Sequence, residues 1–201
     1  MTFCLTICTL NWSLTKDIVT IIGTAGALSI GVAGLSTWRR QLRGASQYDV
    51  AKRAVLLTYQ VQDALQGVRR PMLYLRKEEI ESGRKIEEEQ RIYDERMRTL
   101  LEKWADLRTL SLEARVIWGQ KAEEQFRPVK ELIGELRAEI WMHFWLKGSF
   151  AAPGTTVDNN PERVAANDKI VYKMSEDDDF SKRIDAVVYQ IENFFSARIR
   201  G

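Results

Sequence analysis

The hydrophobic and polar positions of the chain form one uncharged apolar run, followed by several stripes with helical spacing. Residues 18–38 contain no charged side chain. A helix of this length rises about 31 Å at ~1.5 Å per residue, which matches the hydrocarbon core of a bilayer. We therefore predict a transmembrane helix at 18–38. The alternatives are a buried helix of a soluble protein and a cleaved signal peptide.

The flanks of this run predict its orientation. Trp38 is followed by Arg39, Arg40 and Arg43, which is the pattern of a helix end at the cytoplasmic interface. These arginines also oppose translocation of the chain that comes after them, which disfavours a signal peptide. The positive-inside rule places residues 1–17 on the non-cytoplasmic side and residues 39–201 in the cytoplasm. We expect a single-pass protein of the bacterial inner membrane, with membrane lipid as its first partner.

Small residues recur within the predicted membrane helix. Gly23, Ala27 and Gly31 are spaced four apart, so they share one helix face. Such a face lets two helices approach closely, and it predicts a possible homo-oligomer. The alternative is that glycine is simply common in membrane helices.

Three amphipathic stripes occur between residues 39 and 150. The first predicts a helix from Ser46 to Arg70, which Pro71 ends. The second begins at Ile86, and its alternating steps of four and three residues indicate a coiled-coil-like helix. The third ends near Gly148. Their apolar positions are Val50, Ala54, Leu57, Val61, Ala64 and Val68; Tyr93, Met97, Leu100, Trp104, Leu107, Ser111, Ala114 and Trp118; and Phe126, Val129, Ile133, Leu136, Ile140 and Phe144.

These stripes predict an all-α fold in which the transmembrane helix precedes an antiparallel helical bundle. Thr109 and Ser111 are possible caps that would break the second helix in two. Residues 78–85 form a charged connector between the first two helices. Each amphipathic helix must bury its stripe, because propensity alone stabilises an isolated helix poorly.

The last quarter of the chain predicts a loop and a final helix. Residues 151–174 are rich in turn-forming residues and are predicted to be an irregular connector, with a short extended segment at 169–174. Residues 175–201 are predicted to be an amphipathic helix that docks on the bundle. Ser175 and Asp178 have the spacing of a capping box at its start.

Charge and cysteine content exclude several classes of protein. The net charge is only +2, so nucleic acid is not predicted as a partner. Cys4 and Cys8 are the only cysteines, which excludes a disulfide-stapled fold. Their spacing suits a metal or a lipid, but without further ligands they are interpreted as incidental apolar residues.

Candidate chemistry is sparse, and we predict no catalytic, metal-binding or cofactor-binding residues. The single histidine, His143, lies among Trp141, Phe144 and Trp145. This aromatic cluster is interpreted as core packing, with contact to the bilayer interface or a partner surface as alternatives. The acidic run 87–89 is predicted to cap or solvate a helix start. Glu135 and Glu139 are predicted to form surface ion pairs with arginines.

The sequence therefore favours a membrane-anchored interaction, scaffold or regulatory module that binds an unidentified cytoplasmic protein. Two alternatives remain. One is a membrane-perturbing effector that oligomerises through its transmembrane helix. The other is an enzyme with an unrecognised, carboxylate-based site.

Overall fold

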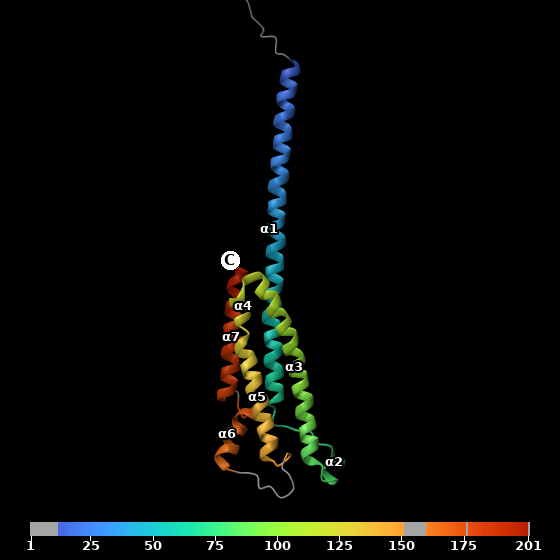
Figure 1. The fold of residues 1–201 in the computed structure, drawn as a ribbon, viewed down its shortest axis with the longest axis vertical. Helices are drawn as coiled ribbons and strands as arrows, with labels where there is room; N and C mark the ends of the chain where they lie inside the picture. Colours follow the sequence, from blue (N-terminus) through green and yellow to red (C-terminus); the bar gives the residue numbers. More distant parts are fainter. Residues whose placement is uncertain (1–11, 151–159, 176, 201) are drawn as a thin grey trace, which may run out of the picture. The chain divides into compact units, whose positions relative to one another are not determined.

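The computed structural model describes residues 12–150, 160–175 and 177–200, which form seven helices (Figure 1). No strand occurs in these ranges, which confirms the all-α prediction. The chain divides into two compact units, residues 1–46 and residues 47–201. Helix α1, Trp12–Val68, contributes residues to both units, so no helix begins at Ser46.

The first unit consists, in its described part, of the N-terminal portion of α1. Its side chains from Lys16 to Ser46 are all exposed. Among the described residues, α1 is the one helix long and apolar enough to cross a membrane, by length and composition. Residues 1–11, which contain Cys4 and Cys8, lie outside the described part of the chain.

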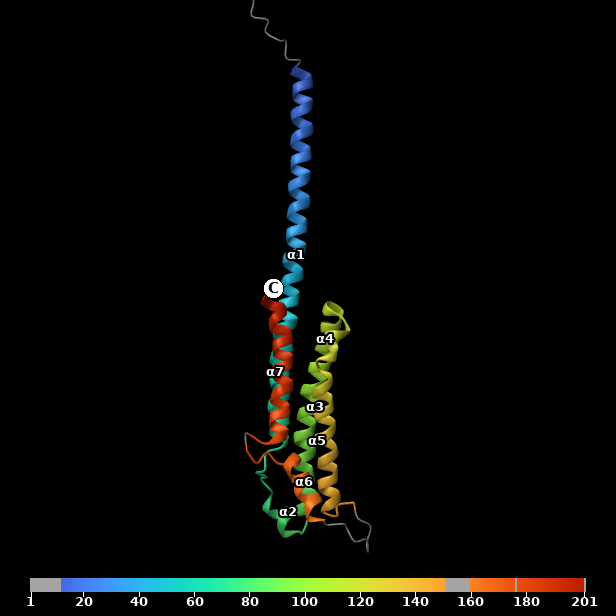
Figure 2. The same ribbon diagram turned by 90° about the vertical axis from the view of Figure 1, so that its left-hand side faces the viewer.

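The second unit is an antiparallel bundle of four long helical segments. These are residues 47–68 of α1, α3 (Lys85–Trp118), α5 (Arg127–Leu146) and α7 (Asp179–Arg200). Successive segments run in opposite directions along the bundle (Figures 1 and 2). Two short helices, α2 (Lys77–Glu81) and α4 (Gln120–Glu124), lie in the connections before and after α3.

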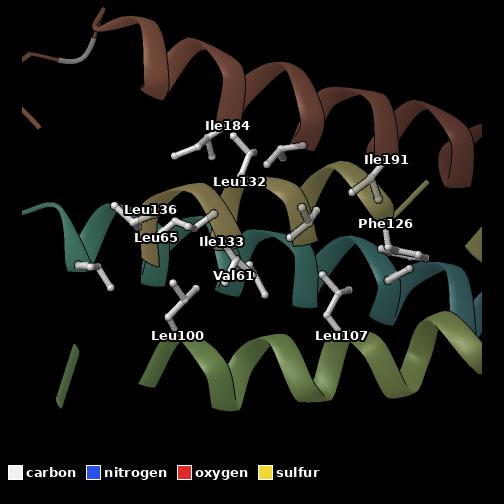
Figure 3. Close-up of a cluster of buried hydrophobic side chains, with 14 of the residues drawn as sticks. Val61, Leu65, Leu100, Leu107, Phe126, Leu132, Ile133, Leu136, Ile184 and Ile191 are labelled. Atoms are coloured by element: carbon white, nitrogen blue, oxygen red, sulfur yellow. The ribbon is translucent and has the colours of Figure 1, made fainter. Parts of the chain in front are cut away.

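The core of this unit lies between the four segments, and the predicted stripes supply most of it. Figure 3 shows buried side chains from all four helices filling the space between them along the bundle. Burying these side chains is the main stabilising contribution, at roughly 25 cal/mol per Å² of apolar surface. The fully or almost fully buried members include Val61, Leu65, Leu100, Leu107, Phe126, Leu132, Ile133, Leu136, Ile184, Ile191 and Phe195.

Helix α3 passes through Thr109 and Ser111 without a break, so the predicted interruption is wrong. The Thr109 hydroxyl donates to the Ala105 carbonyl at 3.0 Å, and the Ser111 hydroxyl donates to the Arg108 carbonyl at 2.6 Å. Hydroxyls that bond backward along a helix in this way do not cap it. The helix ends at Trp118, and the next residue, Gly119, has a φ of +79°, a left-handed conformation that favours glycine.

The irregular connector predicted at 151–174 is wrong for its second half, where helix α6 spans Pro161–Val171. Asn160 and Pro161 look like turn residues in the sequence, but they begin this helix. The Asn160 side chain accepts a hydrogen bond from the Glu162 amide at 3.0 Å, and Pro161 occupies the first turn. Of the predicted extended segment at 169–174, residues 169–171 belong to this helix, and Tyr172 after it has an extended backbone. Residues 151–159 lie outside the described ranges.

The final helix is present as predicted, but its start differs. Helix α7 begins at Asp179, and Asp178 is the capping residue. The Asp178 carboxylate accepts hydrogen bonds from the Ser181 amide at 2.8 Å and from the Ser181 hydroxyl at 2.9 Å. The predicted box at Ser175 is therefore displaced by three residues. The aspartate satisfies an amide that the first turn leaves unpaired.

Candidate functional site

The N-terminal portion of α1 is the most distinctive surface of the described chain. Residues 18–38 expose large apolar side chains, among them Ile22, Leu28 and Ile30 at 66%, 66% and 75%. None of the apolar window is buried within the protein. A contiguous exposed apolar surface of this kind indicates a binding partner or a lipid environment.

Polar side chains in this portion satisfy their hydrogen bonds within the helix itself. The hydroxyls of Thr20, Thr24 and Ser29 each donate to the carbonyl four residues earlier, at 2.8 Å. Ser36 and Thr37 both donate to the Ala33 carbonyl. An unsatisfied hydroxyl is costly in an apolar medium, so these bonds lower the cost of placing the helix in hydrocarbon.

The flanking and small residues predicted from the sequence lie on this helix. Trp38, Arg39, Arg40 and Arg43 are exposed in its continuation. Gly23 and Gly31 have no heavy atom within 4 Å of an added Cβ position, so space is open on their face. Ala27 lies between them and is also exposed. Their roles in membrane contact and helix packing stay predictions.

A buried polar cluster joins α3, α5 and the end of α6 in the second unit. The Glu89 carboxylate accepts a hydrogen bond from Nζ of Lys147 at 2.6 Å and lies 3.4 Å from Nε2 of His143. The Tyr172 hydroxyl lies 3.2 Å from the same histidine nitrogen. Asp168 lies 3.8 Å from the other ring nitrogen, Nδ1. The single histidine is therefore central to a polar network.

This cluster borders a cavity of about 500 Å³, which is lined by His143, Lys147, Asp168 and Tyr172 among others. Burial raises the pKa of the Glu89 carboxyl, but hydrogen bonds from His143 and Lys147 outweigh it and hold that pKa at about 2. Burial raises the pKa of the Tyr93 phenol, which packs against the His143 ring. The network therefore keeps Glu89 ionised and Tyr93 neutral at ordinary pH.

A second buried carboxylate, Glu88, is neutralised by two arginines. Arg76 and Arg91 each donate two hydrogen bonds to it, at 2.8–3.0 Å. The hydrogen bonds from Arg91 and Arg76 hold the pKa of Glu88 well below its usual range. Glu87 is exposed, but Glu88 and Glu89 are both buried, so the predicted solvation of the acidic run is wrong for these two residues. They lie at the start of α3, as predicted. Glu88 pairs with Arg76, before α3, and with Arg91, on α3 itself. Glu89 instead pairs with His143 and Lys147 at the end of α5.

Arg69, immediately after α1, is completely buried and joins three segments of the chain. Its guanidinium donates to the carbonyls of Lys169, Ile170 and Tyr172 at the end of α6, at 2.7–3.2 Å. It also donates to Asp178 at 2.8 Å and Ser181 at 2.9 Å, at the start of α7. Arg69 thereby satisfies the carbonyls that the α6 terminus leaves unpaired. This role is structural.

The predicted partner surface is only partly exposed. Phe144 is 2% exposed and contacts Tyr93 inside the core, so it cannot form a partner surface in this fold. Trp141 is 54% exposed, and its ring stacks on Phe150 with centroids 6.0 Å apart. Trp145 is half-buried beneath the guanidinium of Arg163. Phe144 faces inward because it continues the apolar stripe of α5.

Glu135 and Glu139, both on α5, differ in their partners. Glu135 forms an ion pair with Arg183 of α7, as a surface ion pair between helices. Glu139 instead accepts a hydrogen bond from the Asn167 side chain of α6 at 2.7 Å. The expected arginine partner of Glu139 is therefore replaced by an amide, which helps to hold α6 against α5.

Among the described residues no group of three or more histidine, cysteine, aspartate or glutamate side chains has a metal-binding arrangement. No family model, no curated protein and no solved structure matches the chain.

Sequence reasoning missed the partners of the buried cluster. His143 and Lys147 are four residues apart on α5, a spacing that places them on one helix face and signals a shared contact. No comparable local signal identifies Arg69, because all the hydrogen-bond partners of its side chain lie at least 100 residues away along the chain.

The Glu89 cluster predicts a measurable acid sensitivity. The pKa of Glu89 is about 2 in the folded chain against a usual 4.5. Its contribution to stability is therefore complete above pH ~4.5 and is lost as the pH falls toward 2. Between pH 7 and pH 3 this loss is about 2 kcal/mol. In urea unfolding of the full chain in detergent micelles, Glu89→Gln should lose about 2 kcal/mol less than the wild type over that pH interval.

The control is Glu87→Gln, which alters an exposed carboxylate two residues earlier. This variant should keep the wild-type acid sensitivity. If the two variants lose the same free energy between pH 7 and pH 3, the ionised Glu89 does not contribute as described.

Proposed function

We propose that the chain is a single-pass membrane protein whose helical bundle acts as an interaction or regulatory module on the cytoplasmic face. The observation that carries the proposal is the uncharged helix at 18–38, whose apolar side chains are all exposed and whose end is followed by three arginines. Exposure of this apolar surface to water costs roughly 25 cal/mol per Å². Lipid is the environment that removes this cost.

Two further features support insertion into a bilayer. The hydroxyl groups of Thr20, Thr24 and Ser29 bond to backbone carbonyls within the helix, so they enter an apolar medium already satisfied. The arginines after Trp38 match the positive charge found on the cytoplasmic side of membrane helices. Together they favour residues 1–17 outside and the bundle inside.

The ionisation of the buried carboxylates supports interaction rather than catalysis. A general base works best when its pKa lies near the operating pH. The pKa values of Glu88 and Glu89 are instead held far below that range by arginine, lysine and histidine partners. Such carboxylates accept protons poorly at neutral pH. They fit a role in fixing the helices in place.

Membrane anchoring is tested by alkaline carbonate extraction, combined with protease accessibility of a C-terminal tag in the same membranes. We expect the tag to remain with the membrane pellet and to be cut only when the cytoplasmic side is exposed. A tag cut from the opposite side would contradict the orientation. Release into the supernatant would contradict anchoring itself.

A matched pair of leucine substitutions sharpens this test. Leu28 lies in the middle of the predicted span, whereas Leu56 lies on the same helix in the second unit, and both are exposed. An arginine at the centre of a membrane helix costs about 2.5–3.5 kcal/mol for insertion, which corresponds to about 100-fold. Leu28→Arg should therefore reduce the carbonate-resistant fraction strongly, and Leu56→Arg should leave it unchanged.

The interaction role is tested by affinity capture of the full chain from mild detergent. Trp141 is the exposed member of the predicted partner surface, and Tyr74 is an exposed aromatic control outside it. Trp141→Ser should weaken capture of a protein that co-purifies with the wild type, while Tyr74→Ser should not. Repeated failure to recover any partner or any self-association would contradict this part of the proposal.

A further inference from the structure

A pocket of about 380 Å³ lies between the C-terminal half of α3, the short helix α4 and the start of α5. It lies entirely within the second unit. Its charged lining residues are four bases and two acids: Arg108, Arg115, Arg127, Lys130, Glu123 and Glu124. This excess of positive charge contrasts with the nearly balanced composition of the whole chain.

The acids in this pocket are already engaged, whereas several of the bases are available. Glu123 accepts a hydrogen bond from Arg115 at 2.9 Å, and Glu124 accepts one from the Gln120 side chain at 2.8 Å. Arg127 forms only a loose, exposed pair with Glu131 at 3.6 Å. Arg108 and Lys130 form no side-chain ion pair with any residue in the described ranges.

The start of α5 adds to the positive potential of the pocket. Phe126, Arg127 and Lys130 of this 20-residue helix line the pocket. Its first turn contains no acidic residue, and no side chain caps its free amides. The N-terminus of a helix carries a partial positive charge of about +0.5, which favours an anion. The side-chain cations and the first turn of α5 therefore border the same pocket.

An aromatic wall completes the pocket. Trp104 lines it and is half-buried against the core. An arginine can donate two parallel hydrogen bonds to a phosphate, and lysine acts on it as a point charge. A tetrahedral anion with several oxygens can engage more than one of these cations together. The apolar wall leaves room for an organic substituent of that anion.

From this arrangement we infer that the pocket binds a phosphate group, free or in the headgroup of an anionic phospholipid, through Arg108, Arg127 and Lys130. The inference goes beyond the proposed anchoring role. It rests on the second unit alone and does not require the first unit to span a membrane. The two possible sources of the phosphate are separated by experiment.

The experiment uses the full chain labelled with 5-fluorotryptophan, in nanodiscs of phosphatidylcholine alone or mixed with phosphatidylglycerol. The ¹⁹F resonance of Trp104 is assigned with the Trp104→Phe variant. In phosphatidylcholine nanodiscs, inorganic phosphate is titrated against chloride of equal ionic strength. We expect the Trp104 resonance to move, either saturably with phosphate, which assigns a free anion, or only with phosphatidylglycerol, which assigns a lipid headgroup.

The double variant R108Q/K130Q should raise the dissociation constant for whichever of the two probes binds, phosphate or phosphatidylglycerol, by about tenfold or more, because two charge-assisted contacts are lost. The control is R98Q/R137Q, which removes two exposed arginines from the same two helices, outside this pocket. This control variant should bind the same probe with the dissociation constant of the wild type. The inference is overturned if neither probe moves the Trp104 resonance, or if both double variants lose affinity equally. Should carbonate extraction show the chain to be soluble, the phosphate titration is made in buffer and still decides the inference.

Discussion

Replacing Arg69 with methionine is expected to lower the free energy of unfolding by about 3–5 kcal/mol, the usual cost of removing one partner from a buried ion pair. The substitution leaves the Asp178 carboxylate without its cation. It also removes the donors to the last carbonyls of α6, which are then unsatisfied in part-buried positions. Urea unfolding of the full chain in detergent micelles, followed by circular dichroism, measures the loss.

Arg70→Met is the matched control, because Arg70 is the next residue and its side chain is exposed. Its effect should stay within about 0.5 kcal/mol, as is usual for surface substitutions. A double-mutant cycle with Asp178→Ala then isolates the pair, since residues that share a network do not add. A loss for Arg69→Met no larger than that for Arg70→Met would contradict the structural role of this arginine.

Phe195→Ala is the second substitution with a large expected effect. It should lower the free energy of unfolding by about 3–5 kcal/mol, because it deletes a buried aromatic ring and leaves a cavity. Phe195 is completely buried on α7. Its ring lies 5.5 Å from those of Trp118 and Phe126, measured between centroids. The cavity would therefore open where α7 meets the end of α3 and the start of α5. The same unfolding measurement detects it.

Tyr189→Ala serves as the control on the same helix. Tyr189 has a ring of similar size, but it is 66% exposed. Its truncation should change the free energy of unfolding by less than about 0.5 kcal/mol. Equal losses for the two variants would mean that α7 does not contribute its apolar face to the core.

The helical stripes could be predicted from the sequence because burial imposes a period on a helix. Leu100 and Leu107 of α3, and Ile133 and Leu136 of α5, lie in the core as their spacing predicts. The prediction of secondary structure fails where the same residues are typical of two different structures. Asn160-Pro161 is typical of a turn, yet the same pair begins helix α6.

The buried polar groups are harder to predict, because their partners are set by tertiary packing. The acidic run 87–89 looks solvated in the sequence, and only the approach of α5 places His143 and Lys147 against Glu89. Phe144 is buried, as its position in the third apolar stripe predicts. Trp141 lies outside that stripe and is exposed, so the interpretation of the aromatic cluster as core packing is wrong for Trp141.

The pairing of α1 with α7 has a consequence for synthesis on the ribosome. Tyr59 donates to Glu192, and Gln62 to Asp185, across separations of 133 and 123 residues. At about 5–20 residues per second, α7 is made roughly 6–27 s after the α1 segment that it covers. The apolar stripe of α1 around Val61 and Leu65 therefore stays without its α7 partner for this interval after it has left the ribosome. The bundle can therefore close only after α7 has been translated.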